Sequence, residues 1–298
     1  MSHFATRLSE AIRSSGTPLC MGIDPHPSMM PALFGDVSTA GAPATIRAIE
    51  DFTMACLEMA KGRVAAIKPQ AAFFEAQGHE GMRVLAALGR AAIESGMLVI
   101  MDGKRNDIGS TNAAYADAWI GHDAPFPSDA LTVNAFLGMD TLEPLLARAD
   151  ATGSGLFVLT RTSNPGAGAI QDLEVDGKPL FHRLAEQLAP LAAARCDAKG
   201  GSALGIVAGA TWPAEARALR AILPSSPFLV PGFGAQGAGP ADALAGLQRT
   251  DTGWDAGLIN STRGLIFPKA AADAATMPAW RQAIEDAIEA SRHALANA

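Results

Sequence analysis

The chain has 298 residues, of which 49% are hydrophobic and only 18% charged, and this length suits one large α/β domain or two small ones. Its formal net charge is -7 and it has no basic tract, which argues against sequence-general nucleic-acid binding. No apolar run approaches ~20 residues, so no membrane span is expected.

Cysteine and histidine usage points to an intracellular protein without a metal motif. Cys20, Cys56 and Cys196 are far apart and in no CxxC pair, so we expect buried free thiols and a reducing cytoplasm. The six histidines form no HxH or HExxH pair, and no metal site is predicted. Residues 4–12 carry apolar side chains at helical spacing, which predicts an amphipathic N-terminal helix and not a secretory signal.

Short apolar runs alternate with helical patterns along the whole chain. The expected strands are residues 19–24, 64–69, 97–101, 129–134, 155–160, 204–208, 228–232 and 257–261. The expected helices after them are residues 44–61, 81–94, 112–120, 142–148, 180–196, 214–223, 240–247 and 278–295. Eight repeats predict a single-domain (β/α)8 TIM barrel over residues 1–298, and the alternative is an open doubly wound sheet.

Polar side chains recur where the predicted strands end. In a (β/α)8 barrel, the carboxyl ends of the strands carry the active site. The residues at or just beyond those ends are Asp24, Lys68, Asp102, Lys104, Asn134, Ser163, Gln236 and Arg263. Because the strands themselves are almost wholly apolar, this coincidence predicts an enzyme.

The densest group of charges follows the third predicted strand. Asp102 and Lys104 are two residues apart, so on an extended backbone their side chains leave the same face, and Asp107 comes three residues later. Such charges are costly to bury unless each has a partner. A solvated loop with weak surface pairs, or a helix cap, is the ordinary interpretation. The position directly after a strand favours chemistry.

Two loops late in the chain suit a phosphate group. Residues 232–237 match GxGxxG, but they follow the seventh strand and not the first, so a dinucleotide site is weakly supported. The loops after strands seven and eight of such barrels commonly bind phosphate, and Arg263 in the second loop can grip it in a bidentate way. The alternative is that the glycines only make turns and the arginine lies on the surface. We predict a monophosphate ligand.

The sequence DGKRNDIGST at residues 102–111 resembles the signature of the orotidine 5'-phosphate decarboxylase family, and the chain length resembles its longer bacterial branch, type 2. Supporting motifs occur in the family's order, namely GIDP at 22–25, IKPQ at 67–70, SNPG at 163–166, PGFGAQG at 231–237 and STRG at 261–264. The resemblance spans about residues 19–267. Segments 28–43 and 172–178 depart from the family pattern.

The resemblance implies decarboxylation of orotidine 5'-phosphate to UMP and CO2, a step of de novo pyrimidine biosynthesis, without a metal or organic cofactor. It implies a cytoplasmic homodimer. Lys68, Asp102, Lys104 and Asp107 would form an alternating charged array, in which the neighbouring subunit supplies Asp107. Thr111 would accompany Asp107 across the interface.

The same resemblance assigns the substrate contacts. Asp24 and Lys68 would bind the ribose hydroxyls, and Ser163 would contact the pyrimidine. The remaining implied contacts to the substrate come from Asn134, Gln236, Gly234 and Arg263. Of these, Gln236 would bridge pyrimidine and phosphate, and Arg263 would hold the phosphate.

The chemistry fits this assignment. Loss of CO2 from C6 leaves a carbanion that the ring delocalises poorly, so the protein must stabilise that charge electrostatically. The ammonium group of Lys104 can do so and then donate its proton. Asp102 would face the substrate carboxylate and disfavour the ground state. We expect the flanking acids to keep Lys104 protonated despite burial.

Three other functions stay open on the residues alone. A magnesium-dependent hexulose-phosphate synthase or keto-gulonate-phosphate decarboxylase would use the acids of D-x-K-x-x-D around the metal. A Schiff-base aldolase would need Lys68 or Lys104 as a neutral amine, which neighbouring acids oppose. A non-catalytic barrel would bind UMP without turnover. Arg105 and the Ser-x-Pro-Gly loop favour the nucleotide decarboxylase.

Overall fold

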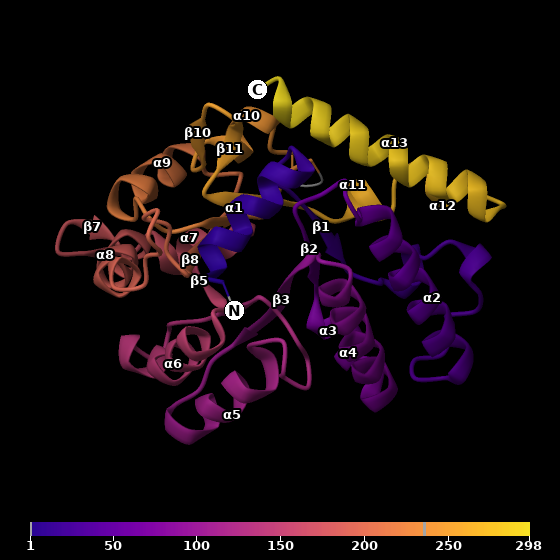
Figure 1. The fold of residues 1–298 in the computed structure, drawn as a ribbon, viewed down its shortest axis with the longest axis horizontal. Coiled ribbons are helices and arrows are strands. Elements are labelled where there is room, and N and C mark those ends of the chain that lie inside the picture. The colour runs from indigo at the N-terminus through magenta and orange to yellow at the C-terminus, as the bar shows by residue number, and fades with distance from the viewer. Residues whose placement is uncertain (1, 235–236) are drawn as a thin grey trace.

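The structure, a computed structural model, describes residues 2–234 and 237–298. Its centre is a closed barrel of parallel strands in the order β1-β12-β9-β8-β5-β4-β3-β2 (Figure 1). The barrel strands are β1 (Leu19–Ile23), β2 (Ala66–Pro69), β3 (Leu98–Arg105), β4 (Ala130–Val133), β5 (Gly155–Arg161), β8 (Leu204–Ala208), β9 (Phe228–Val230) and β12 (Gly257–Ser261). The predicted (β/α)8 barrel is confirmed, because the first and last strands of the sheet, β1 and β12, pair with each other and close it.

Helices surround the barrel (Figure 1). They are α2 (Pro43–Ala60), α3 (Ala71–Glu75), α4 (Gly78–Glu94), α5 (Gly109–Trp119), α6 (Glu143–Thr152), α8 (Leu180–Ala193), α9 (Pro213–Ile222), α10 (Pro240–Leu244), α11 (Arg263–Ile266), α12 (Lys269–Ala272) and α13 (Met277–Ala296). Short 3-10 turns lie at η1 (Pro27–Met29), η2 (Ala32–Phe34), η3 (Met139–Leu142) and η4 (Pro165–Ala167). Over the described ranges, no helix is both long and apolar enough to cross a membrane.

The strands are buried on both faces, which explains why they appear in the sequence as continuous apolar runs. One apolar cluster fills the layer between strands and helices, and a second fills the barrel interior. The predicted N-terminal helix is α1 (Phe4–Ser15), which closes the amino-terminal end of the barrel. Its Phe4 ring meets Phe157 of β5 edge to face at 5.9 Å. A Cβ at Gly155 would lie 2.4 Å from the Phe4 ring, so this position needs glycine.

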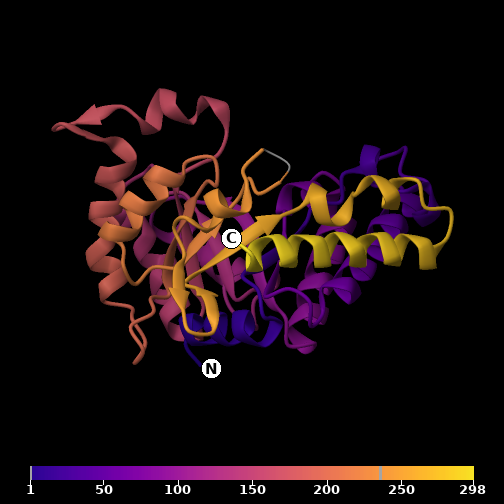
Figure 2. The same ribbon diagram turned by 90° about the horizontal axis from the view of Figure 1, so that it is seen from above.

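The stretch after β5, which we expected to be a long polar loop, contains regular structure. It includes η4, α7 (Gly168–Gln171) and a hairpin of β6 (Glu174–Val175) and β7 (Lys178–Pro179). In Figure 2 this segment projects at the end of the molecule opposite α1. A second small hairpin, β10 (Gln248–Thr250) with β11 (Gly253–Asp255), was also not predicted.

Segment 28–43, which matched no family pattern, packs Phe34 edge to face against Phe52 and Trp280, each at 5.1 Å. It therefore packs against the middle of α2 and the first turn of α13. Cys20 and Cys56 are buried free thiols as predicted, but Cys196 is exposed, because it follows α8 at the protein surface.

Candidate active site

A cavity of about 1080 Å³ opens at the carboxyl ends of the barrel strands. It is as large as the ligand pockets of enzymes. The predicted site residues that line it are Asp24, Lys68, Asp102, Lys104, Asn134, Ser163 and Arg263. Barrel closure thus brings together side chains that are up to 239 positions apart, from Asp24 to Arg263. Gln236, the predicted bridge to the phosphate, lies outside the described residues.

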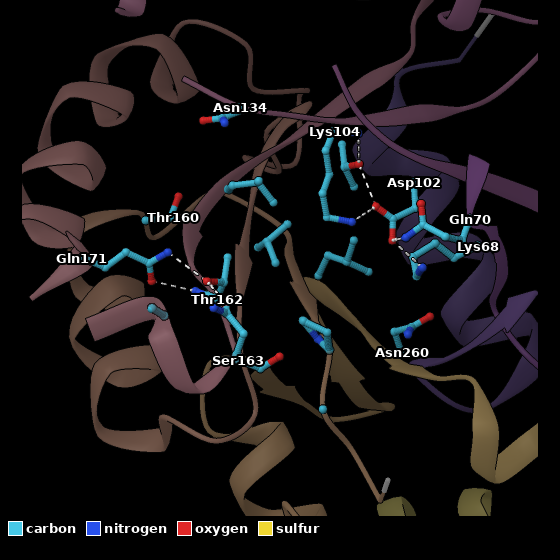
Figure 3. Close-up of a pocket in the computed structure, with 18 of the residues that line it drawn as sticks. Lys68, Gln70, Asp102, Lys104, Asn134, Thr160, Thr162, Ser163, Gln171 and Asn260 are labelled. Atoms are coloured by element: carbon cyan, nitrogen blue, oxygen red, sulfur yellow. Dashed lines mark hydrogen bonds and ion pairs between the residues drawn. The ribbon is translucent and has the colours of Figure 1, made fainter. Parts of the chain in front are cut away.

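Asp102 is the centre of the charged group. Its Oδ2 lies 2.6 Å from Nζ of Lys68, and its Oδ1 lies 2.5 Å from Nζ of Lys104 (Figure 3). Gln70 Nε2 donates to Oδ2 at 3.1 Å, and the Thr132 hydroxyl donates to Oδ1 at 3.0 Å. Each carboxylate oxygen therefore accepts one charged and one neutral hydrogen bond. Such a set fixes the carboxylate rigidly.

The backbone at Lys104 differs from the expected extended strand. Its φ is +49°, in the left-handed region that non-glycine residues rarely occupy. The pairing of β3 with β4 shifts register between Met101 and Arg105, and the Lys104 N–H donates to the Thr132 hydroxyl at 3.0 Å. Lys104 still meets Asp102, but the predicted reason, a shared face of an extended strand, is wrong. A bulge aims the lysine back at the acid.

Each charge of the array changes the pKa of its neighbours. Burial alone would raise the pKa of Asp102, but Lys68 and Lys104 outweigh it and hold that pKa well below its usual range. Burial alone would lower the pKa of Lys68, but Asp102 and Asp24 outweigh it and raise it. Lys68 and Asp102 are therefore both charged at neutral pH.

The pKa of Asp24 is shifted in the direction opposite to that of Asp102. Burial raises its pKa above the ordinary value, although Lys68 acts in the opposite direction. Its Oδ1 is buried and has no hydrogen-bond partner within residues 2–234 and 237–298. An unpaired buried acceptor is costly, so this oxygen is suited to accept a hydrogen bond from a ligand hydroxyl.

The two lysines differ in exposure. The Lys68 side chain is buried, with 5% of its surface exposed, whereas 46% of the Lys104 side chain is exposed. Our expectation that Lys104 is buried is therefore wrong for this structure, because its left-handed backbone places it on the cavity side. Both lysines line the cavity, and Lys104 is the more accessible of the two ammonium groups.

Sequence reasoning missed several polar residues of the cavity, among them Gln70, Thr132 and Asn260. Gln70 and Thr132 support Asp102 as described, and each lies two positions from a predicted site residue. Asn260, in β12, lines the cavity at 8% exposure, and its Oδ1 has no hydrogen-bond partner in the part of the chain that is described. A polar side chain within an apolar strand was the available signal.

The predicted phosphate loops lie side by side, because β9 and β12 are adjacent in the barrel. Gly232 and Gly234 have φ values of 104° and 75°, which favour glycine. Gly232 and Arg263 line the cavity, whereas Gly234 does not. The loop after β12 packs tightly on β1, since a Cβ at Gly22 would lie 1.9 Å from the Thr262 hydroxyl.

Besides Gly234, two further predicted residues do not join the cavity of their own chain. Asp107 and Thr111 are absent from its lining. The Asp107 carboxylate accepts the N–H of Ile108 at 2.7 Å, and Thr111 is exposed in the first turn of α5. Both lie in the loop and helix that follow β3, outside the cavity described above.

Comparisons with known proteins agree on the family. A family model described as orotidine 5'-phosphate decarboxylase / HUMPS family matches residues 17–277. An orotidine 5'-phosphate decarboxylase of Rhodopirellula baltica is 43% identical over 272 residues, which are 90% of this chain and 89% of that protein. One of Streptomyces coelicolor is 42% identical over 243 residues, which are 81% of this chain and 83% of that protein.

Solved structures extend the likeness to three dimensions. The structure of Leishmania donovani OMP decarboxylase is 32% identical and has a TM-score of 0.71, with 99% of this chain and 100% of that chain covered. The family model and both bacterial relatives cover most of the chain, and the residues that the family model matches include every residue that lines the cavity. The chain therefore belongs to the orotidine 5'-phosphate decarboxylase / HUMPS family.

Proposed function

We propose that this protein decarboxylates orotidine 5'-phosphate to UMP and CO2, a step of pyrimidine biosynthesis, using only its own side chains. The observation that carries the proposal is the Lys68–Asp102–Lys104 array within one cavity that also contains Arg263. The bacterial relatives at 42–43% identity are named as orotidine 5'-phosphate decarboxylases. The proposal covers residues 1–298 as one catalytic unit, located in the cytoplasm.

The reaction uses the array as a fixed electrostatic environment. The substrate carboxylate lies beside Asp102, and C6 of the pyrimidine faces Nζ of Lys104. The bond from C6 to the carboxylate carbon breaks, CO2 leaves, and the electron pair remains on C6. Lys104 stabilises this carbanion and transfers a proton to it, and the resulting amine regains a proton from solvent. Lys68 keeps Asp102 ionised throughout.

The rest of the cavity orients the nucleotide. Asp24 and Lys68 bind the ribose hydroxyls, which supply the hydrogen bond that Asp24 Oδ1 lacks among the described residues. Ser163 contacts the pyrimidine, and Asn134 also lines the cavity. Gln236 bridges pyrimidine and phosphate. Arg263, together with the loop that contains Gly234, binds the phosphate, and binding energy gained there organises the charges at C6.

The proposal includes a homodimer in which Asp107 and Thr111 complete the partner's cavity. It is supported by their absence from their own cavity and by the exposed apolar side chains of Ile108, Phe136 and Leu137, of which Ile108 follows Asp107 in the chain and Phe136 lines the cavity. Mixing two inactive variants, Lys104→Ala and Asp107→Ala, tests it. Each mixed dimer would hold one intact site, so about a quarter of wild-type activity should return. Absence of recovery in mixed dimers would contradict a shared site.

The alternatives are weaker on geometry. Both oxygens of Asp102 are held by ammonium groups, which makes it a poor ligand for magnesium. A Schiff-base aldolase needs a neutral amine, and the acids beside Lys68 raise its pKa. A non-catalytic barrel that binds UMP is the remaining alternative.

One assay separates these functions. The loss of orotidine 5'-phosphate absorbance is followed with purified protein in excess EDTA. Conversion to UMP is expected and excludes a metal-dependent sugar-phosphate enzyme. No conversion, with activity on a sugar phosphate once magnesium is added, would overturn the proposal. UMP binding without turnover under either condition would identify a binding protein.

A further inference from the structure

Arg161, the last residue of β5, is a buried cation behind the cavity wall. Its side chain is 2% exposed, and the guanidinium carbon lies 4.1 Å from the centroid of the Trp212 ring and 5.1 Å from that of Phe181. Nη1 lies 2.8 Å from Oδ1 of Asp172, and Nη2 lies 3.9 Å from Glu215. A guanidinium in such surroundings is costly without a partner, so Asp172 is its principal counter-ion.

Asp172 belongs to the segment 163–179, which links β5 to α8 across the cavity mouth. Its neighbour Gln171 lines the cavity and bonds Thr162 twice (Figure 3). Gln171 Oε1 accepts the Thr162 N–H at 3.0 Å, and Gln171 Nε2 donates to the Thr162 hydroxyl at 2.8 Å. From the other side, Trp212 Nε1 donates to the Thr162 carbonyl at 3.1 Å. Thr162 is therefore held between the segment and the aromatic ring that stacks on Arg161.

Ser163 follows directly and has little freedom. The Gly209 N–H donates to the Arg161 carbonyl at 2.8 Å, and a Cβ at Gly209 would lie 2.9 Å from Ser163 Cα. The backbone of residues 161–163 thus packs on the end of β8. The orientation of Ser163 depends on this packing and on the two hydrogen bonds between Gln171 and Thr162.

We propose that Arg161 and Asp172 are positioning residues that latch the segment 163–172 over the cavity and aim Ser163 and Gln171 at the base of the nucleotide. The identity of the base rests on the proposed function, whereas the latch rests on geometry alone. Displacing the segment would leave the buried guanidinium with Glu215 at 3.9 Å as its nearest anion in the described structure, and this opposes opening. Opening of the segment would then break this ion pair as well as the hydrogen bonds of Gln171 with Thr162.

The chain offers a matched control. Asp176, in the same segment, pairs with Arg183 at 3.2 Å on an exposed surface. We compare Asp172→Asn with Asp176→Asn, and Asp172→Glu serves as the conservative variant. Hydrogen exchange of the full-length protein measures the latch. Faster exchange is expected in residues 163–172 of Asp172→Asn only, with the barrel strands unchanged and with partial rescue in Asp172→Glu. Unchanged exchange of this segment in Asp172→Asn would overturn the latch.

Affinity for UMP measures the positioning role. Asp172→Asn is expected to weaken UMP binding about tenfold, and Asp176→Asn less than about twofold. If Asp172 acts through Ser163, its effect combined with Ser163→Ala is less than additive. Full additivity, or unchanged affinity, would overturn the positioning role. Failure of the wild type both to bind UMP and to decarboxylate the substrate would instead refute the proposed function, and hydrogen exchange would still decide on the latch.

Discussion

Removing the buried ammonium group of Lys68 should destabilise the fold far more than removing an exposed one. In Lys68→Met, the methionine fills similar volume, but Asp102 keeps its charge in a buried position. Lys104, Gln70 and Thr132 still contact the carboxylate. Lys104 is half-exposed, so it compensates only in part.

The expected cost follows from this geometry. Breaking a buried ion pair by removing one partner costs about 3–5 kcal/mol, and the remaining contacts of Asp102 place Lys68→Met at the lower end, about 3 kcal/mol. The matched control is Lys61→Met. Lys61 pairs with Glu58 at 2.5 Å, closer than Lys68 pairs with Asp102, but the side chains of Lys61 and Glu58 are 36% and 56% exposed. That substitution should cost about 0.5 kcal/mol or less.

The pH dependence of the free energy of unfolding provides a second, independent test. In the wild type the pKa of Asp102 is depressed, so its stabilising contribution is present above about pH 4 and is lost only in stronger acid. Without Lys68, burial raises this pKa, and the folded state then binds a proton that the unfolded state lacks. The stability difference between Lys68→Met and wild type should therefore shrink as the pH falls from 7 to 5.

Urea denaturation at the two pH values measures these free energies of unfolding. Adding Asp102→Asn to Lys68→Met should recover much of the lost stability, because it removes the stranded charge. The reasoning would be refuted if Lys68→Met cost no more than Lys61→Met, or if the second substitution gave no recovery.

Three further predictions concern single residues of the cavity. Lys104→Ala should abolish decarboxylation while largely keeping thermal stability and UMP affinity, and retained turnover would rule out its role as proton donor. Arg263→Ala should weaken calorimetric binding of UMP at least about tenfold but leave uridine binding unchanged, because the guanidinium holds the phosphate; equal losses for both ligands would contradict this. Asp24→Asn should raise the free energy of unfolding at pH 7 by about 1 kcal/mol, since burial raises the pKa of Asp24 and penalises its charge. This gain should shrink as the pH falls and disappear well below pH 4, where Asp24 is protonated in both states, and a gain independent of pH would refute the explanation.

The barrel could be predicted because its strands are buried on both faces. Runs such as residues 204–208 contain only apolar side chains and glycine, so burial is visible without any knowledge of their neighbours. The hairpin of β6 and β7 left no such trace, because both residues of β6 are exposed and carry no periodicity. Segment 28–43 likewise showed no pattern, since its packing depends on Phe34 meeting rings from α2 and α13.

The side chains at the strand ends could be identified from the sequence, because a polar residue after an apolar run is a local feature of the chain. How those side chains meet depends on the folded barrel. The left-handed backbone of Lys104 depends on the pairing of β3 with β4. The position of Asn260 in the cavity, where its Oδ1 has no partner among the described residues, depends on the pairing of β12 with β1. The ion pair of Arg161 with Asp172 depends on how the segment after β5 folds back over the cavity. Burial, pairing and pKa are set by neighbours that are distant in sequence, and the order of residues does not encode those distances directly.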